Sequence, residues 1–438
     1  MRVASAAGGQ APDLARVREA ARAEVAAGTT PGLAVAVVHQ GRVVLSEGFG
    51  VASVESGSPV TADTVFQIGS VGKMLTAAAV LDGVEEGELS LNEPVGRAVS
   101  GLDPAIAALT PHQLLSQTSG LRDMPGEHGE QGEAAHARFL RALTGADRLL
   151  VPGQAFSYSN IGYSLAGLAV AEAARTGYAD VMARRVFEPL GMPRSTLRPT
   201  VAMTWPLAVG HRRGTDGATT VVRPLANDTR LWPAGYAYST AGDLARFARA
   251  LLANGTRLAA MTTAHAELPL LFGGAQYGYG LILYTSRGAR VAEHAGSMPG
   301  YAALVRLVPE HGFAVIALSN GETPAIRTVD AAMETLLPLR PAPPPPADGP
   351  PMAMTPADMN AIAGRYENRG TFVLSLEGGG LVLRQNDGPP LAVTRVGPDR
   401  YVAAGPENRP RLRFIVTAAD GQRPAMLQFA LWAYRKVS

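Results

Sequence analysis

The stretch Phe66-Gln-Ile-Gly-Ser-Val-Gly-Lys-Met-Leu-Thr-Ala-Ala-Ala-Val80 places Ser70 three residues before Lys73, near the expected start of a helix. Residues three apart lie on one face of a helix, and free amides at a helix N-terminus favour an anionic oxygen. Lys73 is one of only two lysines in the chain, although Lys and Arg together number 39. A desolvated lysine can lose its proton and an arginine cannot, so Lys73 could deprotonate Ser70. Taken alone, the pair also fits a helix cap and a surface lysine.

Two further polar groups follow along the chain. Tyr158-Ser-Asn160 offers a phenol, whose pKa a nearby lysine charge could lower to make a phenolate base, and an amide able to contact the lysine and a substrate. His294-Ala-Gly-Ser297 is expected at a strand edge, where Gly296 admits a substrate and strand amides can face an oxyanion. Each group alone also fits a structural role, as a turn that caps the next helix or as a histidine beside a turn.

In this order, the three groups resemble the motifs of the serine β-lactamase and penicillin-binding-protein superfamily, which are Ser-x-x-Lys, Tyr-x-Asn and Lys/His-x-Gly. The spacings fit, with 88 residues from Ser70 to Tyr158 and a further 136 to His294. The resemblance covers roughly residues 12–337. Supporting segments are Leu109-Thr-Pro-His-Gln-Leu-Leu-Ser-Gln-Thr-Ser-Gly-Leu121, Pro189-Leu-Gly-Met192 and Pro233-Ala-Gly-Tyr-Ala-Tyr-Ser-Thr-Ala-Gly-Asp-Leu-Ala-Arg-Phe247.

The resemblance implies a serine hydrolase that works through an acyl-enzyme. Ser70 would be the nucleophile, and Lys73 and Tyr158 would share the proton transfers, with Tyr158 serving the leaving group and the deacylating water. No cofactor is implied. The expected partner is a small-molecule ester, amide or peptide substrate.

The rest of the site would come from the substrate-binding and oxyanion residues Asn160, His294, Gly296 and Ser297. His294 stands where class C β-lactamases have a lysine that helps to hold a substrate carboxylate, and histidine is mostly neutral at pH 7. This pattern looks like the branch of family VIII carboxylesterases and D-aminopeptidases. The branch implies short-chain esters as substrates. The alternatives are a D-aminopeptidase or D,D-peptidase with weak β-lactamase activity, and a penicillin-binding protein without turnover.

Several loop residues beside these segments are candidates for lining an acyl pocket. They are Gln117, Trp232, Tyr236 and Tyr301. For the aromatic residues, an ordinary place in the core or at its rim fits equally well. Gln117 stands where relatives frequently have histidine.

Composition excludes several other classes of protein. The net charge of +2 and the absence of basic clusters with interleaved aromatics argue against nucleic-acid binding. There is no cysteine, and the 8 histidines form no His-x-x-x-His pattern, so no metal site is expected. No apolar run reaches the ~20 residues of a membrane helix. The compartment stays open: cytoplasmic if the N-terminus is native, periplasmic or secreted if a leader was removed. Oligomeric state is not readable.

The organisation around the motifs predicts an α+β fold. Amphipathic or alanine-rich sequence predicts helices at residues 13–27, 71–89, 162–176 and 243–253. Apolar runs predict one hairpin at residues 32–46 and another at residues 302–318. Strands at both ends with helices between them favour an antiparallel sheet flanked by helices, plus an all-helical region.

A Pro-rich linker at residues 341–351 is expected to separate a catalytic domain, residues 1–340, from a C-terminal domain, residues 352–438. Short apolar runs after it predict a small antiparallel β-barrel, lipocalin-like, or a sandwich. Those runs lie at residues 371–376, 381–384, 391–394, 412–416 and 426–432.

Overall fold

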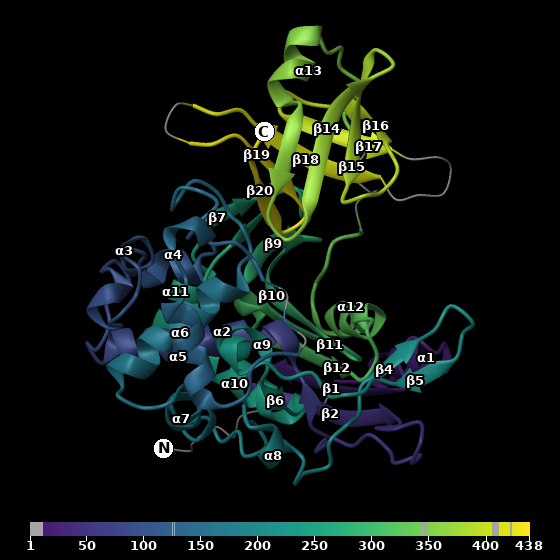
Figure 1. Cartoon of the computed structure of the whole chain (residues 1–438). Helices are drawn as coiled ribbons and strands as arrows, with labels where there is room; N and C mark the ends of the chain where they lie inside the picture. Colours follow the sequence, from purple (N-terminus) through teal and green to yellow (C-terminus); the bar gives the residue numbers. More distant parts are fainter. Residues whose placement is uncertain are drawn as a thin grey trace, which may run out of the picture.

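The computed structural model describes residues 12–124, 126, 128–342, 344, 348–404, 411–420 and 423–438. The expected linker lies partly outside this range. An eight-stranded antiparallel sheet lies at the centre of the N-terminal three quarters of the chain (Figure 1). In spatial order its strands are β2 (Arg42–Gly50), β1 (Gly32–His39), β12 (Phe313–Ser319), β11 (Tyr301–Val308), β10 (Ala289–Met298), β9 (Ile282–Ser286), β8 (Ala275–Tyr277) and β7 (Ala266–Leu268).

The central strands are apolar along their whole length because both faces of the sheet are covered. In β1, Leu33, Val35 and Val37 pack in one core cluster, whereas the alternating Ala34 and Ala36 pack in another. The first cluster lies under α1 (Ala15–Ala26) and α12 (Ile326–Leu336). The second lies under the helical region. Both predicted hairpins are confirmed by the pairing of β1 with β2 and of β11 with β12.

The helical region holds the helices that carry the motifs. They are α2 (Gly72–Glu85), α6 (Asn160–Ala173), α9 (Trp232–Gly235) and α10 (Ala241–Ala253). Almost every residue of α2 and α6 is buried, which matches their alanine-rich, breaker-poor sequence. Further helices are α3 (Pro104–Ala107), α4 (Pro111–Leu115), α5 (Glu133–Arg141), α7 (Tyr178–Met182), α8 (Pro199–Ala202) and α11 (Gly255–Thr262). Two small ladders join β3 (Phe66–Gln67) to β6 (Tyr238–Ser239) and β4 (His211–Arg213) to β5 (Thr219–Val221).

The C-terminal region is a closed eight-stranded antiparallel barrel, so the barrel alternative is confirmed and the sandwich is wrong. It lies over the β7–β9 end of the sheet and carries α13 (Pro356–Ile362) (Figure 1). Its strands are β13 (Gly364–Glu367), β14 (Thr371–Glu377), β15 (Gly380–Gln385), β16 (Leu391–Arg395), β17 (Arg400–Ala404), β18 (Leu412–Thr417), β19 (Met426–Phe429) and β20 (Trp432–Lys436).

One strand prediction in the barrel is wrong in a way that matters below. The run at residues 426–432 is not one strand, because a two-residue turn, Ala430-Leu431, separates β19 from β20. Ala430 has a positive φ of 50°, and no glycine or asparagine marks the turn in the sequence. Within the described residues, no helix is both long enough and apolar enough to cross a membrane.

Candidate active site

Ser70 lies in a single 3-10 turn, Gly69–Val71, that leads directly into α2. Lys73 follows in the first turn of α2 and is completely buried. Its Nζ lies 3.1 Å from Ser70 Oγ, 2.7 Å from Asn160 Oδ1 and 2.5 Å from the Ala234 carbonyl oxygen. The first two motifs therefore meet at one nitrogen atom, as the sequence predicted.

Lys73 can reach its uncharged form near neutral pH. Burial lowers its pKa from 10.5 to about 7, and the Asp123 carboxylate opposes this only in part. A neutral amine has two N–H donors and one lone pair. In that form, Asn160 Oδ1 and the Ala234 carbonyl can accept its two N–H bonds, and the lone pair can then turn to the Ser70 hydroxyl 3.1 Å away. This geometry is the one needed to deprotonate Ser70.

Asn160 is held in place by a buried carboxylate that the sequence did not single out. It is the first residue of α6, and its backbone N–H donates to Asp123 Oδ1 at 2.9 Å. The preceding Ser159 caps the helix by accepting from the Gly162 amide. Asp123 has a fully buried side chain, so each hydrogen bond that it accepts matters energetically.

Tyr158 is a neutral phenol in this site, so the expectation of a phenolate base is wrong. Burial, and next the neighbouring Tyr277, raise the pKa of Tyr158 well above 10, whereas its contact with Ser70 lowers it less. The Lys73 amine lies 4.7 Å from the centre of the Tyr158 ring. Burial also lowers the pKa of Lys73 to about 7, so its charge does less to favour a phenolate than the sequence suggested. Tyr158 can still donate or relay a proton.

The third motif lies on β10 beyond the point where the pairing of that strand with β9 ends. Pairing with β9 ends at Glu293, whereas pairing with β11 continues to Met298, so the edge from His294 onward is open, as expected. A Cβ atom on Gly296 would collide with the Ile68 carbonyl and lie 3.1 Å from the Ser70 amide nitrogen. A Cβ atom on Gly69 would lie 2.6 Å from the Ser297 amide nitrogen. The glycines therefore let the Ser70 and Ser297 amides approach one region.

His294 is buried behind this strand edge. Its Nε2 lies 3.3 Å from the Tyr277 hydroxyl and its Nδ1 lies 2.7 Å from the Ala295 carbonyl oxygen. Burial, reinforced by the charge of Lys73, lowers the pKa of His294 to about 3. The third motif thus presents a neutral imidazole at pH 7, as the sequence suggested.

A cleft of about 530 Å³ opens in front of Ser70. The motif residues Tyr158, Asn160, His294, Gly296 and Ser297 all line it. Tyr236 lines it as well, as expected. The other lining residues are Gly126, Arg212, Leu231, Ala234, Gly235, Ile282, Ala295, Met298, Pro299, Ala302, Glu322, Pro324, Arg369, Leu431 and Trp432.

Three of the four candidate pocket residues do not line this cleft. Gln117 is buried behind the Tyr-x-Asn segment, where its Oε1 accepts from the Ser159 amide at 2.8 Å. Tyr301 donates to the Ala208 carbonyl at 2.7 Å and borders a groove elsewhere on the molecule. Trp232 donates from its indole to Asn227 Oδ1 and faces a separate cavity. Each side chain is directed away from Ser70 by its own hydrogen bond.

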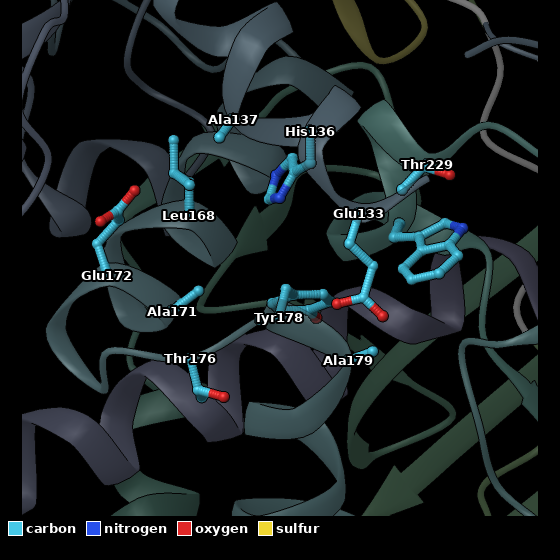
Figure 2. A pocket seen from close by; sticks show the side chains of 12 residues that line it. Glu133, His136, Ala137, Leu168, Ala171, Glu172, Thr176, Tyr178, Ala179 and Thr229 are labelled. Atoms are coloured by element: carbon cyan, nitrogen blue, oxygen red, sulfur yellow. The ribbon is translucent and has the colours of Figure 1, made fainter. Parts of the chain in front are cut away.

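The cavity beside Trp232 measures about 120 Å³ and is shown in Figure 2. His136, Glu133 and Tyr178 surround it. Burial lowers the pKa of His136 to about 4, and its Nε2 lies 2.9 Å from the Ser164 carbonyl. Glu133 pairs with Arg198. Because His136 and Glu133 already have these partners, we interpret both side chains as structural. Among the described residues, no cluster of His, Asp and Glu could hold a metal ion.

The barrel contributes directly to the site; a lid that supplies a loop to the active site was one of the three roles that the sequence left open for the C-terminal region, beside oligomerisation and binding. The Tyr158 amide donates to the Leu431 carbonyl at 2.8 Å, in the turn between β19 and β20. Trp432 packs edge-on against the Tyr158 ring, and its indole N–H donates to Asp123 Oδ2 at 3.0 Å. Asn368, between β13 and β14, accepts from the Asp123 amide. The backbone of a motif residue is thus fixed by the last hairpin of the chain.

Known proteins resemble the part of the chain that carries the three motifs, and one of them resembles nearly the whole chain. The family model "Beta-lactamase" matches residues 17–337. Penicillin-binding protein 4 of Amycolatopsis lactamdurans is 31% identical over 78% of this chain and 94% of its own length. The crystal structure of SurE with D-Leu has a TM-score of 0.80 and 25% identity, covering 97% of this chain and 100% of that one. The D-alanine carboxypeptidase AmpC from Burkholderia cenocepacia has a TM-score of 0.59 and 25% identity, covering 74% of this chain and 99% of that one.

Proposed function

The chain belongs to the Beta-lactamase family, and from that premise we propose that it is a serine hydrolase that forms an acyl-enzyme on Ser70. The observation that carries the proposal is the placement of the buried Lys73 amine, whose pKa is lowered to about 7, at 3.1 Å from the Ser70 hydroxyl. A hydroxyl needs such a base before it can attack a carbonyl carbon.

In the proposed acylation step, the Ser70 proton passes to Lys73 as Oγ attacks the substrate carbonyl. The negative charge that develops on the carbonyl oxygen is met by the Ser70 and Ser297 amides. Each donor of this kind contributes about 10²–10³ in rate. Asn160 keeps the amine oriented, because it accepts one of the two N–H bonds of Lys73.

The leaving group then needs a proton, which Tyr158 supplies as a neutral phenol and recovers from Lys73. In deacylation the proton transfers among these groups are reversed, and water takes the place of the leaving group. The raised pKa of Tyr158 suits a donor rather than a resting base.

For the substrate, we favour an amide, peptide or ester that carries a D-residue over the small short-chain esters that the sequence branch suggested. The similarity to the crystal structure of SurE with D-Leu extends over 97% of this chain and so includes the barrel. The cleft of about 530 Å³ also exceeds what a short acyl chain fills. Short-chain esters remain the second candidate, supported by the neutral His294 in the third motif.

The replacement Ser70→Ala tests the acyl-enzyme. It should lower turnover of p-nitrophenyl butyrate and of D-alanyl-p-nitroanilide at least ~10³-fold, because the nucleophile is gone. Release of p-nitrophenol or p-nitroaniline measures both. Ser58→Ala, at an exposed serine, is the matched control and should keep full activity. Comparable activity in Ser70→Ala would refute the proposal.

The same assays separate the finer alternatives. A preference for D-alanyl over L-alanyl anilide, with weak nitrocefin hydrolysis, would favour the D-residue hydrolase. A mass increase on Ser70 that persists for hours after β-lactam treatment, with no turnover of any substrate, would indicate a penicillin-binding protein that acylates only.

A further inference from the structure

The three motifs leave the cleft without a cation to receive a substrate carboxylate. His294 is neutral at pH 7, and Lys73 is buried with its contacts directed to protein groups. Arg212 lines the cleft, but its guanidinium is bound by both carboxylate oxygens of Glu322. If the substrate carries a carboxylate, the partner has to come from another element.

Arg369 of the barrel is such a partner. It follows β13 in the connection to β14 and lines the cleft together with Ser70 and Tyr158. Its side chain is 40% exposed. Its guanidinium carbon lies 5.0 Å from the centre of the Trp432 ring, a cation–π contact that orients the group. Within the described part of the chain, no hydrogen bond uses its N–H donors.

Asp123 lies near Arg369 but does not accept a hydrogen bond from its guanidinium. The closest approach, from Arg369 Nη1 to Asp123 Oδ2, is 3.7 Å, which is beyond hydrogen-bond length. The two oxygens of Asp123 already accept from the Asn160 amide and the Trp432 indole. The carboxylate therefore offsets part of the charge and fixes its place, while the N–H donors of Arg369 stay available in the cleft that it lines.

There is room for a substrate group at this position. Arg369 and Trp432 also line a second hollow of about 250 Å³ on the barrel side, so the two hollows share these residues. The second hollow is lined by Phe372, Phe429 and Tyr434 and by the polar Gln385 and Asn386. A substrate that extends from Ser70 past Trp432 into the second hollow would run along residues of both hollows, Arg369 among them.

We propose that Arg369 binds a carboxylate of the substrate, so that the barrel supplies the anion recognition that His294 cannot. An arginine fork matches the two oxygens of a carboxylate, and the partly desolvated setting strengthens the pair. The inference rests on the proposed hydrolase and narrows its substrates to carboxylate-bearing peptides or esters. Arg369 would thereby take the place of the lysine that class C β-lactamases have in the third motif.

The test compares substrates that differ only in a carboxylate. One pair is N-acetyl-D-alanyl-D-alanine and its C-terminal amide, with the carboxylate on the leaving group. The other is the p-nitrophenyl monoester of glutaric acid and that of glutaramic acid, with the carboxylate on the acyl chain. For the carboxylate-bearing substrate of one pair, Arg369→Gln should lower kcat/KM about 10- to 100-fold, mainly by raising KM. Both neutral partners should change less than about twofold. The affected pair identifies which side of the scissile bond faces Arg369.

Controls separate recognition from folding and from chemistry. Arg384→Gln, at a barrel arginine paired with Glu377, should leave all four rates unchanged. Arg369→Lys should retain part of the preference for the acid, because it keeps the charge but loses the fork. Equal losses on acids and neutral partners in Arg369→Gln would overturn the inference while leaving the hydrolase in place. If the unaltered protein turned over none of the four substrates and no D-alanyl anilide, the proposed function itself would fail.

Discussion

Lys73 shows how much one buried side chain can decide. Arginine supplies nearly every other cation in the chain, and at this position an arginine could not serve, since it keeps its proton in any protein environment. Desolvation disfavours the charged form of Lys73, and the three polar contacts hold the amine where the Ser70 proton leaves. The same burial acts on Tyr158 in the opposite chemical direction and keeps it protonated.

The pKa of Lys73 predicts a pH profile. Because the neutral amine is the active form, kcat/KM for p-nitrophenyl butyrate should rise about tenfold per pH unit below about 7 and level off above it. Lys73→Arg should lower the rate nearly as much as Lys73→Ala, since arginine stays charged. Steady-state rates between pH 5 and pH 9 measure both. An active Lys73→Arg protein, or a profile that falls with rising pH, would contradict this role.

At the scale of elements, the β19–β20 turn is the connection with the largest consequence. Leu431 in the turn places its carbonyl against the Tyr158 amide, and Trp432, the first residue of β20, places its indole against Asp123. The cluster around it joins Leu431 and Trp432 to Phe156, Tyr158 and Tyr277. The turn is therefore both part of a hydrophobic core and a support for the proton-transfer residue.

The replacement Trp432→Phe should test this support. Phenylalanine keeps an aromatic ring against Tyr158 but leaves Asp123 Oδ2 without its indole donor. The loss of a hydrogen bond to a buried carboxylate is expected to cost about 1–3 kcal/mol of stability. The rate on the neutral p-nitrophenyl butyrate should also fall, since Asp123 anchors Asn160. Thermal unfolding and steady-state kinetics measure the two effects. Trp205→Phe, at a tryptophan outside the cleft, is the matched control.

At the scale of the whole molecule, the barrel completes the cleft rather than merely following it. Deletion of residues 352–438 should abolish ester hydrolysis even in a folded product, because Leu431, Trp432 and Arg369 leave the site together. It should also expose Phe156 and Tyr158 and so lower stability. Activity, far-UV circular dichroism and solution mass measure the outcome. A deletion product with full activity would show that the barrel has another role, such as binding or oligomerisation.

The sequence by itself determined what depends on local pattern. Helical and strand periodicity predicted the helix after Ser70, both hairpins and the antiparallel sheet, and the motif order predicted that Ser70, Lys73, Tyr158 and Asn160 would meet. Only the tertiary structure decided that Tyr158 is protonated, that Trp232 and Tyr301 face elsewhere, and that the barrel brings Trp432 and Arg369 to the cleft. The reason is physical: a pKa depends on desolvation by distant segments, and a contact between residues some 300 positions apart leaves no periodic trace in either segment.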